Sequence, residues 1–163
     1  LGGFRMGPFA LMDLIGHDVN YVVTETVWKQ FYYDPRFRPS LSQKRLLEAG
    51  WLGRKSGRGF YDYRNGATLP EPTRDEALGR RIVDRVVAML INEAADAVYR
   101  GIGSESDVET AMLKGVNYPK GLIAWGREWG WTTVRDRIEA LHRRTGDARY
   151  RVCPWIHDQI SAQ

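Results

Sequence analysis

Apolar residues recur along most of this chain at three- and four-residue spacing, which is the period of an amphipathic helix. The clearest stretch is residues 74–100, which ends before Gly101 and Gly103. Its apolar positions are Ile82, Val83, Val86, Val87, Leu90, Ile91, Ala94, Ala95 and Val98. The apolar face is wide, as expected for a helix at the centre of a bundle. No stretch alternates apolar and polar residues as an open strand would, so the pattern predicts an all-α protein.

Further helices are predicted wherever a capping residue, a proline or a glycine bounds an apolar stripe. They lie at about residues 8–15, 18–32, 40–49, 104–114, 121–130 and 132–144. Gly146 stops the last of them. The glycines within residues 53–59 break the helical pattern, and residues 60–63 are predicted to be extended against a neighbouring surface.

The chain contains an internal repeat with an offset of 114 residues, or 113 in its later part. Glycines and an alanine around a short helix recur first: Gly7, Ala10 and Gly16 as Gly121, Ala124 and Gly130. An Asp-x-Arg-aromatic-Arg turn recurs next: Asp34, Arg36, Phe37 and Arg38 as Asp147, Arg149, Tyr150 and Arg151. Two ordered sets at nearly one offset indicate a duplication.

The duplication divides the chain into residues 1–63 as a first copy, residues 64–73 as a linker rich in proline and polar residues, and residues 74–163 as a second copy. Two predicted helices precede the repeated part of the second copy, and none precedes that of the first. We therefore expect two related helical subdomains, the first truncated at its N-terminus, in what looks like part of a longer protein.

Charge and composition exclude some functions. The net charge is +4, but acidic residues are interspersed, which favours a solvated surface over a patch for nucleic acid or a phosphorylated ligand. We expect no nucleic-acid partner. No apolar run approaches the ~20 residues of a membrane span, so no membrane partner is expected either. The single cysteine, Cys153, rules out an internal disulfide and favours the reducing cytoplasm.

Few residues suggest chemistry. His17, His142 and His157 share no metal-ligand spacing with one another or with Cys153, so they are interpreted as surface or capping histidines, with no metal site. The loop at residues 53–59 lacks the spacing of a phosphate loop or a dinucleotide fingerprint. It is either a glycine-permitted turn or a partial clamp for an anionic ligand. Asp84, at the edge of an apolar helix face, is expected to pair with Arg80 or Arg81.

Several motifs resemble the C-terminal domain of 3-hydroxyacyl-CoA dehydrogenases. They are MGPFALMDLIGHD at residues 6–18, GRKSGRGFYDY at residues 53–63, and the segments 92–94, 104–112 and 115–119. The resemblance covers essentially the whole chain and is strongest to bacterial enzymes with two such domains in tandem, including those of phenylacetate and 3-hydroxybutyryl-CoA metabolism. It implies a fold like the C-terminal domain of 6-phosphogluconate dehydrogenase.

The resemblance also implies an activity. Such enzymes oxidise a 3-hydroxyacyl-CoA to the 3-ketoacyl-CoA with NAD, which a Rossmann domain binds beside a catalytic His–Glu pair. The helical domain closes over the acyl-CoA and provides a dimer contact. Since this chain lacks the Rossmann half, we expect it to hold no catalytic, cofactor-binding or metal residue, and NAD to belong to the full-length enzyme. The substrate-binding residues implied are Met6, Gly7, Pro8, Arg54, Lys55 and Arg58.

In the family, an asparagine early in the first long helix helps to hold the substrate oxygen. The matching position of the second copy is Asp84, which would repel developing negative charge, so we expect this copy to mimic a dimer partner and not to bind substrate. The leading hypothesis is the substrate-closing and dimerisation region of such an enzyme, as a cytoplasmic homodimer. The alternative is a non-catalytic dimerisation or acyl-CoA-binding helical module.

Overall fold

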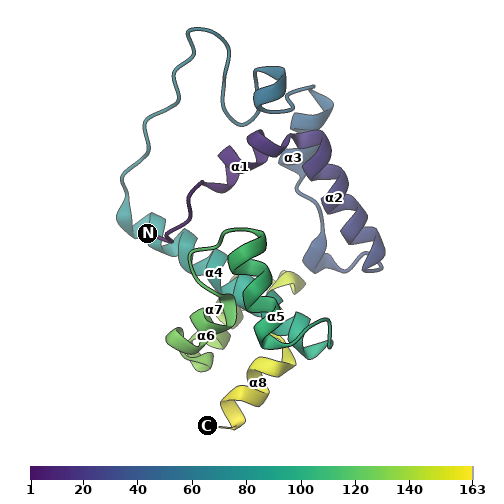
Figure 1. Cartoon of the computed structure of the whole chain (residues 1–163), viewed down its shortest axis with the longest axis vertical. Helices are drawn as coiled ribbons and strands as arrows, with labels where there is room; N and C mark the ends of the chain where they lie inside the picture. The colour runs from purple at the N-terminus through teal and green to yellow at the C-terminus, as the bar shows by residue number, and fades with distance from the viewer. Residues whose placement is uncertain (163) are drawn as a thin grey trace. The chain divides into compact units, whose positions relative to one another are not determined.

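The computed structural model describes residues 1–162, which form eight α-helices and no strand (Figure 1). The helices are α1 (Pro8–Ile15), α2 (His17–Gln30), α3 (Leu41–Glu48), α4 (Glu76–Tyr99), α5 (Glu105–Thr110), α6 (Leu122–Trp129), α7 (Trp131–Thr145) and α8 (Pro154–Ser161). The prediction of an all-α protein is confirmed. Within the described residues, no helix has the length and apolar character needed to cross a membrane.

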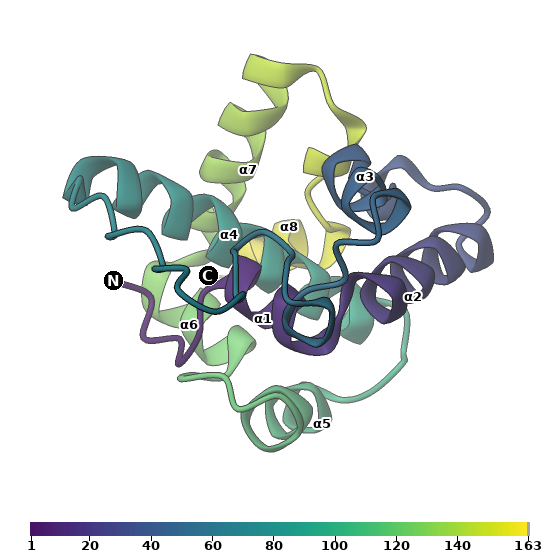
Figure 2. The same cartoon turned by 90° about the horizontal axis from the view of Figure 1, so that it is seen from above.

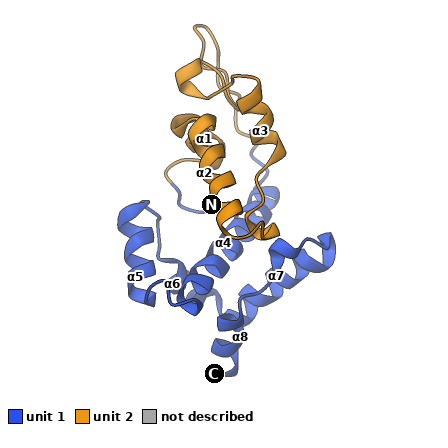
Figure 3. Cartoon of the chain, turned by 90° about the vertical axis from the view of Figure 1, so that its right-hand side faces the viewer, with its two compact units in different colours: residues 1–4, 74–163 blue, residues 5–73 orange. Residues whose placement is uncertain are grey.

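The chain forms two compact units, coloured separately in Figure 3. One comprises residues 5–73 with α1 to α3, and the other comprises residues 74–163 together with residues 1–4. The first four residues belong to the larger unit (unit 1 in Figure 3) and contact it through Phe4, whose ring lies 5.2 Å from that of Tyr118.

Helix α4 is the centre of the larger unit, where it contacts α5, α6, α7 and α8 (Figure 2). Its buried side chains recur at helical spacing and meet apolar residues of the other helices. The predicted apolar face is confirmed over the centre and end of the helix, but its early positions Ile82 and Val86 are 54% and 42% exposed. The core contains Val87, Ala88, Ile91, Ala94, Ala95, Leu122, Ile123, Val134, Ile138 and Ile156. The centre of this helix therefore carries the hydrophobic core of the unit.

The smaller unit is built differently, because much of its interior is polar. Asp13 and His17 are completely buried, and Gln43 is nearly so. The amide nitrogen of Gln43 donates a hydrogen bond to the side-chain oxygen of Asn20 at 2.5 Å, which ties α3 to α2. Buried polar groups need such hydrogen-bond partners, and each hydrogen bond restricts how the chain can fold around the buried group.

The order of elements agrees with the internal repeat. The order α1, α2, a 3-10 turn and α3 is matched by α6, α7, a 3-10 turn and α8. Gly16 and Gly130 join the paired helices with similar backbone angles, φ 101° and ψ 134° against φ 80° and ψ 133°. Asp34 and Asp147 each accept a hydrogen bond from a backbone N–H two residues later, at 2.9 and 3.0 Å.

Two details of the sequence prediction were wrong. The segment 104–114 is not one α-helix, because α5 ends at Thr110 and residues 111–115 form a π-helical turn. Helix α8 was not predicted, although it has Pro154 at its start and Ile156 and Ile160 one turn apart. Its start is held by the buried Asn92, whose side-chain oxygen accepts from the backbone N–H of Cys153 at 2.8 Å.

Candidate functional site

The glycine-rich loop at residues 53–59 lies directly against α1. A Cβ atom added to Gly53 would lie 2.2 Å from the carbonyl oxygen of Asp13, and one added to Gly59 would lie 2.1 Å from its carboxylate. No side chain fits at such distances. The close approach of loop and helix therefore requires glycine at both positions. This agrees with the interpretation of the loop as a glycine-permitted turn.

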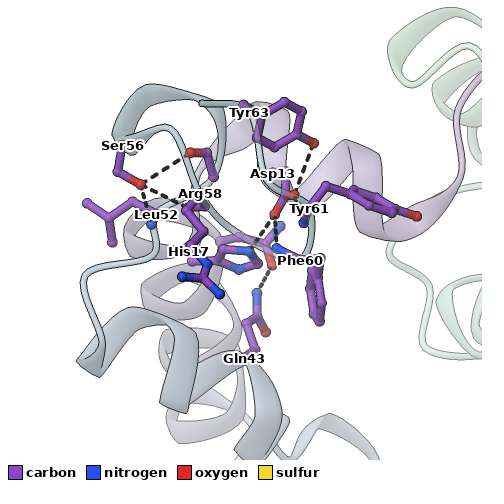
Figure 4. A network of polar contacts seen from close by, with 11 residues as sticks. Asp13, His17, Gln43, Leu52, Ser56, Arg58, Phe60, Tyr61 and Tyr63 are labelled. Atoms are coloured by element: carbon purple, nitrogen blue, oxygen red, sulfur yellow. Dashed lines mark hydrogen bonds and ion pairs between the residues drawn. The ribbon is translucent and has the colours of Figure 1, made fainter. Parts of the chain in front are cut away.

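A serine closes the loop on itself. The hydroxyl of Ser56 accepts a hydrogen bond from the backbone N–H of Leu52 at 2.7 Å and lies 2.9 Å from the carbonyl oxygen of Arg58 (Figure 4). The backbone N–H of Gly53 also donates to the carbonyl of Arg58, at 2.7 Å. The loop is thus a folded element with its own hydrogen bonds.

The carboxylate of Asp13 is the centre of this element (Figure 4). It accepts hydrogen bonds from the backbone N–H groups of Phe60 and Tyr61, both at 2.9 Å, and from the hydroxyl of Tyr63 at 3.0 Å. The ring nitrogen Nε2 of His17 is its fourth partner, at 2.8 Å. These contacts hold residues 60–63 against α1. The prediction of an extended segment was only partly right, because Phe60 and Tyr61 lie in bends and Asp62 forms an isolated β-bridge with Arg58.

Burial and hydrogen bonding act in opposite directions on the Asp13 carboxyl group. Burial by itself raises its pKa, because it disfavours the charged form. The hydrogen bonds from Tyr61, Phe60, His17 and Tyr63 favour the charged form, and together they hold the pKa of Asp13 below its ordinary value. Asp13 is therefore a buried carboxylate at neutral pH.

The interpretation of His17 as a surface or capping histidine was wrong, since its side chain is completely buried. Because the Asp13 carboxylate can only accept, the proton of a neutral His17 ring lies on Nε2. Its other nitrogen, Nδ1, has no hydrogen-bond partner among residues 1–162, and its ring lies 5.0 Å from that of Phe60. The interpretation fits the other two histidines: His142 is exposed beside the carbonyl of Asp147, and His157 is exposed.

The three basic residues of the loop have different surroundings. Lys55 forms an ion pair with Asp18 at 2.5 Å, and this contact lowers the pKa of the Asp18 carboxyl group. The Arg58 guanidinium stacks on the Trp51 ring at 3.6 Å and is partly buried. Arg54 is exposed, and its guanidinium lies 5.6 Å from the centre of the Tyr63 ring.

The remaining predicted site residues lie at the other end of α1. Gly7 is its N-cap and Pro8 its first residue, while Lys55 lies beside Gly16, just past its last residue. A helix of this length spans about 12 Å. Met6, Gly7 and Pro8 therefore do not share one cluster with Lys55, although the loop and α1 belong to one folded unit.

Asp84 has a partner other than the expected Arg80 or Arg81. Its carboxylate lies 3.1 Å from the guanidinium of Arg137 on α7, while Arg80 pairs with Glu76. The expectation considered only residues of the same helix, and it failed because α7 packs alongside α4.

Comparison with known proteins identifies the family. The family model of the 3-hydroxyacyl-CoA dehydrogenase C-terminal domain matches residues 1–63 and 82–163. The 3-hydroxyadipyl-CoA dehydrogenase of Escherichia coli K12 is 32% identical over 242 residues, covering 96% of this chain and 51% of that protein. A probable 3-hydroxybutyryl-CoA dehydrogenase of Bacillus subtilis 168 is 47% identical over 81 residues, covering 50% of this chain and 28% of that protein.

A solved structure extends the match to three dimensions. The crystal structure of 3-hydroxybutyryl-CoA dehydrogenase from Escherichia coli K12 has a TM-score of 0.83 and 30% sequence identity, over 97% of this chain and 52% of that one. The chain spans about half the length of these Escherichia coli relatives. The match to the 3-hydroxyadipyl-CoA dehydrogenase extends over more residues than this chain has, so a segment of that relative has no counterpart here. The chain belongs to the family of 3-hydroxyacyl-CoA dehydrogenase C-terminal domains, whose model matches it in two successive segments.

Proposed function

We propose that this chain is the substrate-closing and subunit-association region of an NAD-dependent 3-hydroxyacyl-CoA dehydrogenase. The reaction would oxidise the 3-hydroxyl group of an acyl-CoA to a ketone, with transfer of hydride to NAD. The observation that carries the proposal is the family match over both halves of the chain. The relatives named above are dehydrogenases that act, by their names, on 3-hydroxyadipyl-CoA and 3-hydroxybutyryl-CoA.

The chemical step belongs, in this proposal, to another part of the enzyme. Removal of the hydroxyl proton needs a base that can reach the substrate. His17 is buried and bonded to Asp13, and the ring of His142 contacts the carbonyl oxygen of Asp147. Neither is arranged as a general base with an orienting carboxylate in an open site.

The residues of this chain do not fit NAD. A dinucleotide site uses glycines after a strand so that a helix N-terminus can approach the pyrophosphate. Residues 1–162 form no strand, and Gly53 and Gly59 are occupied by the approach to α1. NAD would therefore be bound by the Rossmann domain of the full-length enzyme.

The part of this chain in the reaction would be to hold the acyl-CoA. The exposed cations Arg54 and Lys55, on a loop fixed by Asp13, suit the phosphates of CoA, which would compete with Asp18 for Lys55. Arg58, stacked on Trp51, is the third cation of the loop. Met6, Gly7 and Pro8 would contact the substrate from the start of α1. The second copy would bind no substrate, since Asp84 stands where the family has an asparagine and its carboxylate is paired with Arg137.

Self-association is the second part of the proposal. The exposed sides of α1 and α2 carry large apolar residues that are about half exposed: Leu11, Leu14, Ile15, Val19, Val22 and Val23. An apolar surface of this kind on a water-soluble protein is commonly covered by another protein surface. We propose that a second copy of this chain covers it, in a cytoplasmic homodimer.

The test is an assay of NAD reduction with 3-hydroxybutyryl-CoA, with the chain alone and with a full-length relative as the positive control. We expect no turnover by the chain and measurable binding of acetoacetyl-CoA by calorimetry. Binding should weaken in the variant Arg54→Gln/Lys55→Gln and stay unchanged in Arg64→Gln, which removes a nearby cation paired with Asp62. Turnover by the chain alone would contradict the proposal.

The alternative is a free-standing module that dimerises or binds acyl-CoA without catalysis. It rests on the same helices, so binding data do not separate it from the first proposal. The gene does: a Gly-x-Gly-x-x-Gly fingerprint upstream in the same reading frame would establish the enzyme, and a start codon directly before residue 1 would favour the module.

A further inference from the structure

A groove in the larger unit lies between the first half of α4 and α7. Its volume is about 510 Å³, within the range of small-molecule sites. The residues that line it are Leu78, Arg81, Ile82, Asp84, Arg85, Arg137, Ala140, Leu141 and Arg144. The lining thus combines aliphatic side chains with four arginines and one carboxylate.

The charges of the groove are not balanced. Asp84 neutralises Arg137, whose guanidinium also stacks on the Trp129 ring at 4.0 Å. Within the described residues, no carboxylate lies within ion-pair distance of Arg81, Arg85 or Arg144. Three positive charges therefore remain around one concave surface.

The arrangement of these arginines costs stability in the free protein. Arg81 and Arg85 lie one helical turn apart on α4, a spacing at which like charges repel. Arg85 is held in place by the hydroxyl and the ring of Tyr150. Guanidinium groups bind carboxylates and phosphates through paired hydrogen bonds, so an anion in the groove would relieve the repulsion.

The apolar part of the lining limits what the anion can be. Ile82 is 54% exposed and Leu78 is 40% exposed, so both present aliphatic surface to whatever enters the groove. A bare inorganic ion would leave this surface in water, whereas an alkyl chain would cover it. The groove therefore suits a molecule with an anionic group at one end and a linear alkyl chain behind it.

We propose that this groove binds an amphiphilic anion, namely a linear alkyl chain that ends in a carboxylate or a phosphate. Arg81 and Arg144 bind the anionic group, and Ile82, Leu78 and Leu141 contact the alkyl chain. The site is separate from the acyl-CoA contacts proposed above, because its residues belong to α4 and α7 and not to the loop at 53–59. It does not depend on the dehydrogenase proposal.

The experiment is isothermal titration of the whole chain with four probes below their micelle concentrations. Octanoate and octyl phosphate carry the two anionic groups, octyl glucoside has the same alkyl chain without charge, and inorganic phosphate has the charge without the chain. We expect octanoate or octyl phosphate, or both, to bind at least tenfold more tightly than the last two. Whichever of octanoate and octyl phosphate binds more tightly identifies the anionic group that the groove prefers.

The chain offers a matched pair of variants. Arg81→Gln/Arg144→Gln removes two charges from the groove, while Arg80→Gln/Arg143→Gln removes two from the preceding positions of the same helices, where each arginine pairs with a glutamate. We expect at least tenfold weaker binding in the first variant and a change below twofold in the second. Equal loss in both variants, equal binding of octyl glucoside, equal binding of inorganic phosphate, or no binding of either anion would each overturn the proposal.

Discussion

The carboxylate of Asp13 lies 2.8 Å from the ring of His17, one helical turn later, and both side chains are completely inaccessible to solvent. The pair lies at the junction of α1 and α2 and binds the loop that returns at residues 60–63. Asp13 therefore joins α1 and the start of α2 to a segment that lies 47 to 50 residues later in the sequence.

This geometry predicts a large effect of Asp13→Asn on stability. The amide that replaces one carboxylate oxygen cannot accept, so at least one buried donor among Phe60, Tyr61 and Tyr63 loses its partner. We expect the free energy of unfolding to fall by about 3 kcal/mol in urea denaturation. Glu25→Gln, in an exposed pair with Lys29, is the control and should change stability little. A similarly small effect of Asp13→Asn would contradict the central role of this carboxylate.

The same group predicts a pH dependence. The pKa of Asp13 is lowered in the folded chain, so the folded state favours the ionised carboxylate more than the unfolded state does. Its contribution is complete above the pKa of the unfolded chain, near 3.8, and is lost as the pH falls through the lower folded value. We expect the difference in stability between the parent chain and Asp13→Asn to shrink below about pH 4. A difference that stayed constant from pH 6 to pH 2.5 would refute this.

The loop predicts that its glycines cannot be replaced. In Gly59→Ala, the added methyl group would lie 2.1 Å from the Asp13 carboxylate, so loop and helix would have to separate. We expect a loss of about 2–4 kcal/mol in the free energy of unfolding. Gly7→Ala is the control: Gly7 has φ −68°, and apart from its chain neighbours no described residue has an atom within 4 Å of an added Cβ, so the change should stay within about 0.5 kcal/mol.

Much of the fold could be predicted from the sequence because its signals are local. The spacing of apolar residues in α4, and the capping residues and glycines at helix ends, gave most helices to within a few residues. The repeat was visible because Gly16 and Gly130 adopt backbone angles that other residues avoid. Helix α8 was missed although Pro154 stands at its start: no glycine marks its end, where Ala162 follows, and its start is held by Asn92, a contact across 61 residues of sequence.

The errors in the site have the same physical origin. His17 was predicted to be a surface residue. It is buried only because the loop folds back and places Phe60 against its ring, next to its contact with Asp13, and local sequence does not show that fold. The spacing of four residues between Asp13 and His17 was the one local signal that could have suggested their contact. The true partner of Asp84 is Arg137 on α7, which packs against α4. Local sequence does not show which helices pack together, so the prediction chose a neighbour of Asp84 on its own helix.

The core of the larger unit predicts that Val87→Asp is strongly destabilising. Val87 is completely buried among aliphatic side chains, and an aspartate there would be an unpaired buried charge. We expect a loss of roughly 3 kcal/mol or more. Val116→Asp in the same unit is the control, because Val116 is 55% exposed in a loop. If both variants melted within a degree or two of the parent chain, α4 would not be the centre of the core.

The last prediction concerns the apolar side of α2. Val19, Val22 and Val23 are each at least half exposed, so their replacement should not disturb the interior of the smaller unit. Trp28 is a poorer probe of association, because its ring packs against that of Tyr33 at 5.0 Å and its loss would affect folding as well. If a second copy covers the valines, a charged side chain placed there would be buried in the contact and would weaken the association.

We therefore expect the chain to sediment as a dimer at tens of micromolar, and Val22→Glu to shift it toward the 18.7 kDa monomer while the helical circular dichroism of the chain stays unchanged. Thr26→Glu, one turn further along the same side of α2 at an exposed polar position, tests how far the contact extends. A parent chain that sediments as a single species at the monomer mass would exclude the dimer. A dimer that Val22→Glu leaves intact would show that copies of the chain associate through another surface.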